Sequence, residues 1–194
     1  MIENYGTLKA AVARRAVRTD LTDDIPDFIR SAHDKIVGEV SLAVDLTLTT
    51  GTTALPTDFR QVNSLWLVNR PWIQVCEASP EQMSTATGTG RPYIFRISGS
   101  DLIVYPVPEP AYPAKLLYQI SRDFFASDVA TNAILTRYPS VYLYGAVAEL
   151  GRQTADDDLI TRFQPMFFAE IVRINQIETG DAMRGPLQVT SSAP

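Results

Sequence analysis

The chain has 194 residues, of which 45% are hydrophobic and 20% are charged, so it is long enough to bury the core of one domain. Its net charge of −5 argues against binding a phosphate backbone as the main activity, because that needs clustered lysines and arginines. No apolar run is long enough to span a bilayer, and no signal-peptide pattern is present. The single cysteine, Cys76, excludes an internal disulfide framework and suits a reducing cytoplasm.

Two helices are expected in the first 45 residues. Thr7 is a candidate N-cap for a short helix, and Pro26 opens a longer helix that runs to about Val44. Gly38 weakens the longer helix by about 1 kcal/mol relative to alanine, a cost that close packing would explain. The apolar stripe of this helix consists of Ile29, Ala32, Ile36, Val40 and Ala43.

The hydrophobic period changes from 3.6 to 2 between residues 46 and 120, which predicts a β-rich insertion. Strands are expected over residues 60–68, 72–76 and 115–120, with one helical turn after Ser79 and a proline-rich linker over residues 106–113. The segment YIFRISGSDLIVYP predicts a hairpin, because Gly99-Ser100 suits a two-residue turn of type II′. The turn sets a register that pairs Ile97 with Leu102, Phe95 with Val104 and Ile94 with Tyr105.

Residues 131–177 predict two consecutive helices, each with one apolar stripe. Pro139 suits the first turn of the first helix, and Asp156 to Asp158 suit the start of the second. Pro165 lies within the second helix and predicts a kink. The stripes are Leu143, Ala146, Val147 and Leu150 in the first helix, and Ile160, Phe163, Phe167, Ile171 and Ile174 in the second.

These elements predict an α+β fold that is mainly a bundle of about four helices. The bundle would comprise residues 1–45 and 121–179, and residues 46–120 would form the β-rich insertion. Residues 180–194 contain two glycines, two prolines and no periodicity, which predicts a flexible C-terminal tail.

The sequence offers little for catalysis, and we expect no catalytic residue, cofactor or metal site. His33, the only histidine, lies on the polar flank of its helix and is interpreted as a surface residue. Cys76 has no basic neighbour in its strand, so it is interpreted as a small apolar filler rather than a nucleophile. The aspartates at 20, 23, 24 and 27 lack the spacing of a calcium loop, and helix capping explains them.

Several large apolar residues lie in segments that are not evidently core. Burial within the subunit is the default interpretation, but interfaces also concentrate aromatic residues and arginine. The candidates for contacts with other subunits or the tail are Trp66, Trp72, Arg91, Phe124 and Phe125; Phe168 shares the same character.

Four segments carry a resemblance to a known family. They are YGTLKAAVARRAVRTDLTDDIPDFIRSAHDKI, LPTDF, GRPYIFRISGSDLIVYPVP and TNAILTRYPSVYLYGAVAEL. In order and spacing they resemble the head-to-tail adaptor proteins of tailed bacteriophages, over about residues 5–176. Their most specific residues are Arg18 to Thr22 with Pro26 to Ile29, and Thr131-Asn132 with Pro139 and Tyr142 to Ala146. The chain departs from the family pattern at Pro165.

The resemblance implies a virion protein that assembles in the host cytoplasm as a ring of about twelve copies. Such rings lie beneath the portal and carry the tail nozzle or a tail-completion protein below. The C-terminal tail would then bind the portal, through Gly185, Pro186, Leu187, Gln188 and Val189. Twelve copies would carry a net charge of about −60, which presents passing DNA with a wall to which it does not adhere. No membrane contact is expected.

A small tail-associated cell-wall hydrolase is the alternative function. Some proteins in this position of a related fold have been suspected of that activity. The sequence shows no acid/base carboxylate pair in a recognisable motif, which favours the structural adaptor.

Overall fold

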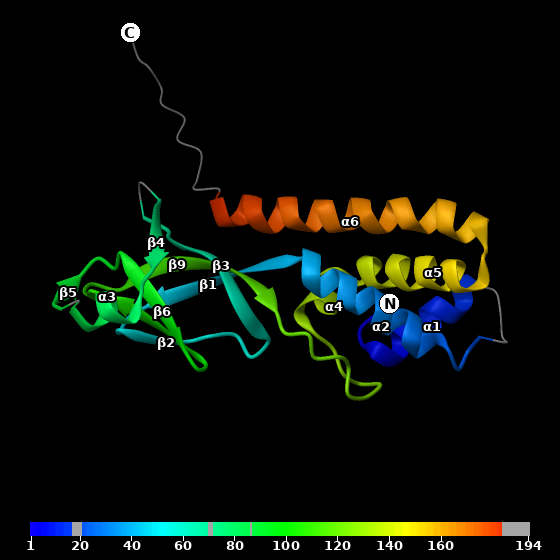
Figure 1. The fold of residues 1–194 in the computed structure, drawn as a ribbon, viewed down its shortest axis with the longest axis horizontal. Coiled ribbons are helices and arrows are strands. Elements are labelled where there is room, and N and C mark those ends of the chain that lie inside the picture. The colour runs from blue at the N-terminus through cyan, green and yellow to red at the C-terminus, as the bar shows by residue number, and fades with distance from the viewer. Residues whose placement is uncertain (17–20, 70–71, 86, 184–194) are drawn as a thin grey trace, which may run out of the picture. The chain divides into compact units, whose positions relative to one another are not determined.

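The computed structural model describes residues 1–16, 21–69, 72–85 and 87–183 (Figure 1). The helices of this part are α1 (Tyr5–Ala16), α2 (Ile25–Glu39), α3 (Pro80–Thr85), α4 (Ala133–Arg137), α5 (Pro139–Thr154) and α6 (Asp157–Met183). Its strands are β1 (Ser41–Leu48), β2 (Thr52–Ala54), β3 (Phe59–Leu67), β4 (Ile73–Glu77), β5 (Thr89–Gly90), β6 (Ile94–Ser98), β7 (Asp101–Tyr105), β8 (Val107–Pro108) and β9 (Tyr112–Ile120). The chain divides into a helical unit, made of residues 1–42 and 119–177, and a sheet unit, made of residues 43–118 and the end of α6.

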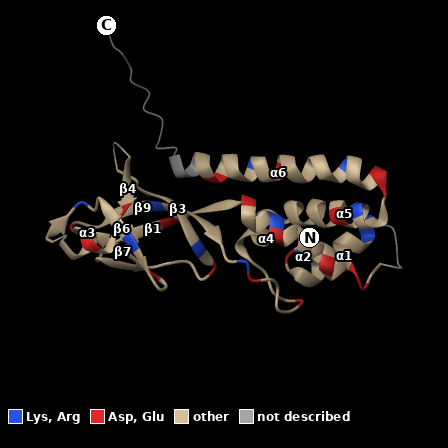
Figure 2. Cartoon of the chain, in the orientation of Figure 1, with Lys and Arg blue, Asp and Glu red and all other residues tan. Residues whose placement is uncertain are grey.

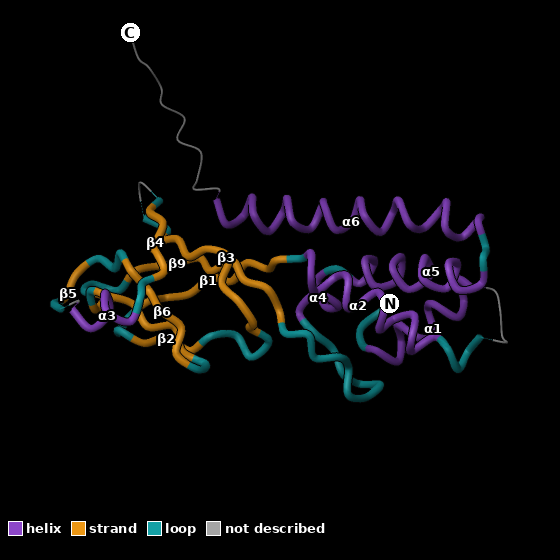
Figure 3. The backbone as a smooth tube through the Cα atoms, in the orientation of Figure 1, coloured by secondary structure: helices purple, strands orange, loops and turns teal. Residues whose placement is uncertain are grey.

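The prediction of a mainly helical bundle of about four helices is wrong. Seven strands join in one mixed sheet in the order β1-β9-β3-β4-β6-β7-β2, and β5 pairs with β8 (Figure 3). The described residues form nine strands and six helices. The helical periods can be read from the sequence, whereas pairings between distant strands cannot. The sequence therefore led us to overestimate the share of the fold that is helical.

The seven-stranded sheet curls until its two edge strands approach each other. β1 and β2 are the opposite edges, yet only residues 49–51 connect them. Four Cα steps span at most about 14 Å. Seven flat strands spaced about 4.8 Å apart would separate the edges by about 29 Å. The connection therefore requires the sheet to bend round, and the sheet is nearly closed.

The boundary between α2 and β1 differs from the prediction. α2 ends at Glu39 rather than near Val44, because Val40 adopts an extended backbone with φ −98° and ψ 132°. β1 follows at once, with Leu42 and Leu48 fully buried. Apolar residues also alternate over residues 40–48, so the segment fits a strand as well as a helical stripe, and pairing with β9 in the sheet favours the strand.

The hairpin of β6 and β7 has the predicted register. Ile97 pairs with Leu102, and Phe95 pairs with Val104 in the antiparallel ladder. Gly99 takes a φ of +62°, the left-handed region that the first position of a primed turn requires. This prediction is confirmed because turn type and alternation are both local properties of the sequence.

Helix starts follow the expected capping chemistry except at α1 and α2. The Asp24 side chain at the start of α2 accepts no capping hydrogen bond, so helix capping does not explain that aspartate. Pro26 and Pro139 lie in the first turns of α2 and α5, as predicted. Thr7 is not the N-cap of α1. The helix begins earlier, and the Asn4 Oδ1 accepts from the Thr7 N–H at 2.9 Å while the Thr7 Oγ1 accepts from the Asn4 N–H at 3.0 Å. This reciprocal pair satisfies two backbone donors at the start of α1.

In the helical unit α5 lies between α6 on one side and α1 and α2 on the other (Figure 1). The helices meet at Gly145, where an added Cβ would lie 2.9 Å from the Ala32 Cβ of α2 and 2.8 Å from the Phe167 ring of α6. Gly145 therefore permits the close crossing. The close packing expected at Gly38 is wrong, because nothing lies within 4 Å of a Cβ at that position.

α6 continues as one helix through Pro165. Its ribbon in Figure 1 shows no sharp kink. Pro165 and Thr161 both lie on the exposed face of the helix, so the Thr161 carbonyl that lacks a Pro165 N–H donor can bond to water. The opposite face is the predicted apolar stripe, with Phe163, Phe167, Ile171 and Ile174 buried.

Side chains of α6 also satisfy the backbone of β1 at the sheet edge. Within the helical unit, the Asn175 Oδ1 accepts from the Ser41 N–H at 3.1 Å, and its Nδ2 donates to the Glu39 carbonyl at 2.7 Å. Within the sheet unit, the buried Glu178 accepts from the Ala43 N–H at 2.6 Å. These bonds fix the start of β1 and occupy edge donors that would otherwise attract another chain.

Candidate interface surfaces

The predicted portal-binding residues, Gly185 to Val189, lie outside the described residues. α6 extends to Met183, so this segment follows the last helix directly. Its role in portal binding stays a prediction.

Phe124 and Phe125 belong to an aromatic cluster inside the helical unit. The Phe125 ring stacks on Tyr5 with centroids 5.1 Å apart, and the Phe124 ring meets Tyr5 edge-on at 5.3 Å. Phe124 also meets the His33 ring at 5.4 Å, and Phe125 lies 5.6 Å from Tyr142. Both phenylalanines stay half-exposed. Their main contacts pin the segment before α4 onto α1, α2 and α5.

His33 is buried, with 1% of its surface exposed, so its interpretation as a surface residue is wrong. The Nε2–H of its ring donates to the Arg122 carbonyl at 3.3 Å, which leaves Nδ1 to accept from the Tyr142 hydroxyl at 2.9 Å. The Asn132 Nδ2 donates to that hydroxyl at 2.8 Å. Burial lowers the pKa of His33 and raises that of Tyr142, so both side chains are neutral at pH 7.

Two residues from the most specific part of the family resemblance therefore have a structural role. Asn132 also caps α4, because its Oδ1 accepts from the Leu135 N–H at 2.8 Å. Asn132 and Tyr142 join the start of α4, the interior of α5 and, through His33, the interior of α2. The segment that buries His33 lies nearly ninety residues further along the chain. The helical period around His33 therefore could not predict that this side chain is buried.

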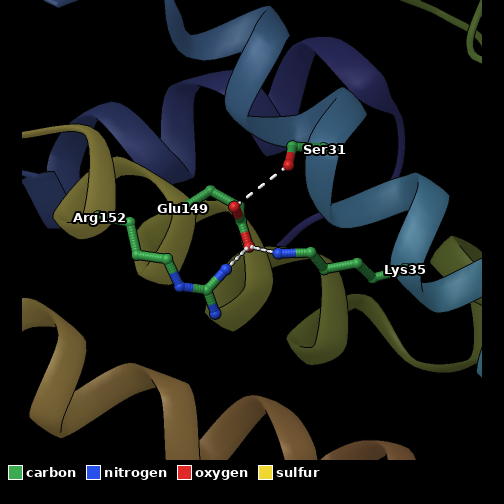
Figure 4. A network of polar contacts seen from close by, with 4 residues as sticks. All are labelled: Ser31, Lys35, Glu149 and Arg152. Carbon is green, nitrogen blue, oxygen red and sulfur yellow. Dashed lines mark hydrogen bonds and ion pairs between the residues drawn. The ribbon is translucent and has the colours of Figure 1, made fainter.

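A second polar network links α2 to α5 around Glu149, which is 8% exposed (Figure 4). One carboxylate oxygen accepts from the Lys35 Nζ at 2.5 Å and from Arg152 Nη1 at 2.7 Å. The other accepts from the Ser31 hydroxyl at 3.1 Å. Two cations and a hydroxyl thus neutralise the buried carboxylate. This arrangement fixes two helices and leaves no free carboxylate for acid–base chemistry at Glu149.

The candidates in the sheet unit are partly accessible. Trp66 in β3 and Trp72 before β4 are half-buried, and Arg91 is exposed. The Trp66 Nε1 is buried without a hydrogen-bond partner in the described structure. Cys76 is exposed, so its interpretation as an apolar filler is wrong: its neighbour Val75 takes the inward face of β4, and alternation turns Cys76 outward.

The sequence prediction singled out Phe168 but missed the rest of the outward face of α6 as a candidate surface. Of the seven large apolar side chains that are exposed in the described part of the chain, four lie on α6. Phe168 is 50% exposed and Val172 55% exposed, and they are one helical turn apart. We define the outward stripe as Pro165, Phe168, Val172, Gln176 and Thr179, which recur at helical spacing opposite the buried stripe.

The outward stripe contains no charged residue, although α6 carries acidic and basic residues along its length (Figure 2). Arg162 and Arg173 flank it on one side, eleven residues apart. Arg173 forms a bidentate pair with Glu170, at 2.9 and 2.6 Å, and this pairing lowers the pKa of Glu170. The spacing of Phe168 and Val172 was a signal for this surface, since it repeats the helical period on the face away from the core.

The described residues contain no group of three or more His, Cys, Asp or Glu side chains placed to hold a metal ion. None of their helices has the length and apolar character needed to cross a membrane.

The exposed apolar side chains of Phe168 and Val172 in the outward stripe form a surface suited to contact with another protein. The comparison with known families agrees. The chain belongs to the SU10 adaptor protein family, whose model matches residues 3–190. It is therefore a phage adaptor, a structural component of the virion that contacts other head and tail proteins. A search of curated proteins found no match.

Proposed function

We propose that the chain joins the capsid vertex of a tailed phage to its tail, as a ring of about twelve copies beneath the portal. The ring carries the nozzle or a tail-completion protein below and lets DNA pass through its centre. The family match over residues 3–190 is the observation that carries this proposal.

Two properties of the chain support a ring around DNA. The net charge of −5 per chain keeps a multimer acidic, so the DNA backbone is not retained by it. A ring subunit also needs two separate surfaces for its neighbours, and the outward stripe of α6 supplies one apolar surface that the described residues leave uncovered.

We propose that the C-terminal segment around Leu187 and Val189 binds the portal. These residues are two apart, so an extended segment would present both on one side. Such a segment can add backbone hydrogen bonds to a partner while its apolar side chains enter pockets. Trp66, Trp72, Arg91, Phe124 and Phe125 are proposed to contribute the exposed parts of their side chains to contacts with neighbouring subunits or the tail.

Cryo-electron microscopy of the tail vertex tests the proposal. We expect a ring of about twelve copies between the portal and the tail, with a continuous central channel. Density for this chain elsewhere in the virion, or its absence from the virion, would contradict the proposal.

A further inference from the structure

We infer that residues 121–131, which we name the β9–α4 loop, detach from the helical unit when His33 takes up a proton. This inference goes beyond the proposed function and stands or falls separately from it. Detachment would also free the rings of Phe124 and Phe125, two of the proposed contact residues, for other proteins.

The β9–α4 loop lies on the surface of the helical unit and contains no helix or strand. Two aromatic side chains hold its first half in place. The Phe124 and Phe125 rings both pack against Tyr5 of α1 and His33 of α2, with centroids 5.1 to 6.0 Å apart. Detachment of such a loop costs less free energy than unfolding of the packed helices beneath it.

The hydrogen bonds around His33 require its neutral ring. The Nε2–H donates to the Arg122 carbonyl of the loop, and Nδ1 accepts from the Tyr142 hydroxyl. Because the Asn132 Oδ1 caps α4, this amide presents its Nδ2 donor to the same hydroxyl. A proton on Nδ1 would give the hydroxyl two donors and remove the acceptor of its own hydrogen. The buried ring is therefore neutral under the loop and takes up a proton readily once water reaches it, so a falling pH favours detachment.

The charged groups around His33 do not reverse this preference. Burial is the largest influence on its pKa and lowers it, and Arg30 of α2 acts in the same direction. The hydrogen bond to Arg122, Asp34 of α2 and Asp123 of the loop raise the pKa, but the net shift is downward. The other titratable or charged side chains next to His33 or its aromatic neighbours are Tyr5, Lys9, Asp27, Asp128 and Tyr142.

The second half of the loop is bonded to the start of α1, which provides a direct readout. The Tyr5 and Gly6 N–H groups donate to the Ala130 and Asp128 carbonyls at 2.9 and 2.8 Å. These are the first two residues of α1, whose N–H groups have no partner within the helix. The Tyr5 ring also supports both phenylalanines, so the two halves of the loop depend on the same residue. Exchange of these two amide hydrogens with solvent therefore reports whether the loop is attached.

Amide hydrogen exchange measured by NMR at pH 7 and pH 5 tests this inference, with each rate corrected for the intrinsic effect of pH. Between these values a solvent-exposed histidine with the ordinary pKa of 6.5 becomes mostly protonated, which raises the population of the detached loop by up to about 25-fold. Exchange at Tyr5 and Gly6 should accelerate by up to that factor. The Leu8 N–H donates to the Asn4 carbonyl at 3.0 Å in the same helix, so it is the matched control and should not accelerate.

Two variants identify the group that titrates. His33→Gln keeps a donor and an acceptor at this position but does not titrate, so Tyr5 and Gly6 should exchange at the same corrected rate at both pH values. Asp128→Asn removes the ion pair with Lys9 and should speed exchange at both pH values, while the pH dependence persists. His33 is the only histidine, so one imidazole NMR signal reports its protonation, and its midpoint should lie below pH 6.5. This measurement needs no substitution and decides the matter if His33→Gln fails to fold.

Four results would overturn the inference, and each would leave the proposed function intact. Corrected rates at Tyr5 and Gly6 that do not change with pH would show that the loop stays attached. Equal acceleration at Leu8 would show that α1 unfolds rather than that the loop detaches. A pH dependence that survives in His33→Gln, or that is lost in Asp128→Asn, would assign the effect to another group. An imidazole midpoint at or above pH 6.5 would show that the attached loop does not favour the neutral ring.

Discussion

At the scale of single residues, the buried hydroxyl of Tyr142 links three helices of the helical unit through its hydrogen bonds. It receives one hydrogen bond from Asn132 and gives one to His33, so it connects α4 and α2 through α5. Tyr142→Phe keeps the ring but removes the hydrogen-bond partner of the buried His33 Nδ1 and of the half-buried Asn132 Nδ2. We expect a loss of about 1–3 kcal/mol in the free energy of unfolding.

Chemical denaturation measures that loss. Tyr144→Phe is the matched control, since Tyr144 lies two residues away on α5 and is half-exposed, and it should cost little. Equal effects of the two substitutions would show that the hydroxyl of Tyr142 has no special role.

The burial of His33 predicts a pH dependence of stability. Its pKa is lowered from the ordinary value of 6.5 by burial, so the unfolded chain binds a proton more readily than the folded chain. The contribution of neutral His33 to the free energy of unfolding is therefore complete above about pH 6.5. It is lost as the pH falls through the lowered pKa. We expect the melting temperature to fall between pH 7 and pH 5.

His33→Gln should flatten that dependence, which thermal unfolding at a series of pH values will measure. Glu170 does not interfere in this range, because its lowered pKa affects stability only below its ordinary value of 4.5. A variant with the same decline as the unmodified chain would exclude His33 as the cause.

At the scale of elements, two glycines in helices provide a paired test of packing. Gly145→Ala places a methyl group against Ala32 and Phe167 where no space exists, and should cost about 1–3 kcal/mol. Gly38→Ala meets open space near the end of α2 and should stabilise the chain by up to about 1 kcal/mol.

Denaturation of the two variants side by side gives the answer, because both add the same single methyl group. Opposite signs are expected. A stabilising effect of Gly145→Ala would contradict this prediction. It would mean that α2 and α6 can move away from Gly145 without a loss of stability.

Local sequence signals predicted the elements well and their assembly poorly. The turn at Gly99 and the prolines at the starts of α2 and α5 were predictable, because each acts within a few residues. The end of α2 was not, since residues 40–48 satisfy a helical and a strand period at once. The burial of His33 and the curled sheet depend on contacts between distant segments, which no local period reports. The helical spacing of Phe168 and Val172 could have revealed the outward stripe of α6 in the sequence. The sequence could not show that this stripe is exposed.

At the scale of the whole molecule, the C-terminal segment should attach the ring without supporting the fold. The double substitution Leu187→Asp and Val189→Asp should leave the melting temperature unchanged and abolish capture by immobilised portal. About twelve weak tails act together in a ring, so a modest loss in each is multiplied. Deletion of residues 185–194 should have the same effect.

Substitution of Gln188 with Ala in the same segment is the matched control, because it leaves both apolar side chains in place. Normal capture by the double aspartate variant would show that the described helical and sheet units make the portal contact instead.

The mass of the complex between this chain and its portal tests the central claim most directly. Native mass spectrometry should find the isolated chain mainly as a monomer, because its stable assembly needs the portal as a template. With the portal ring added, it should find one complex that contains about twelve copies of this chain. A stable ring in the absence of portal would contradict the templated assembly. No complex at all with portal from the same virion would contradict the role as a head-to-tail adaptor.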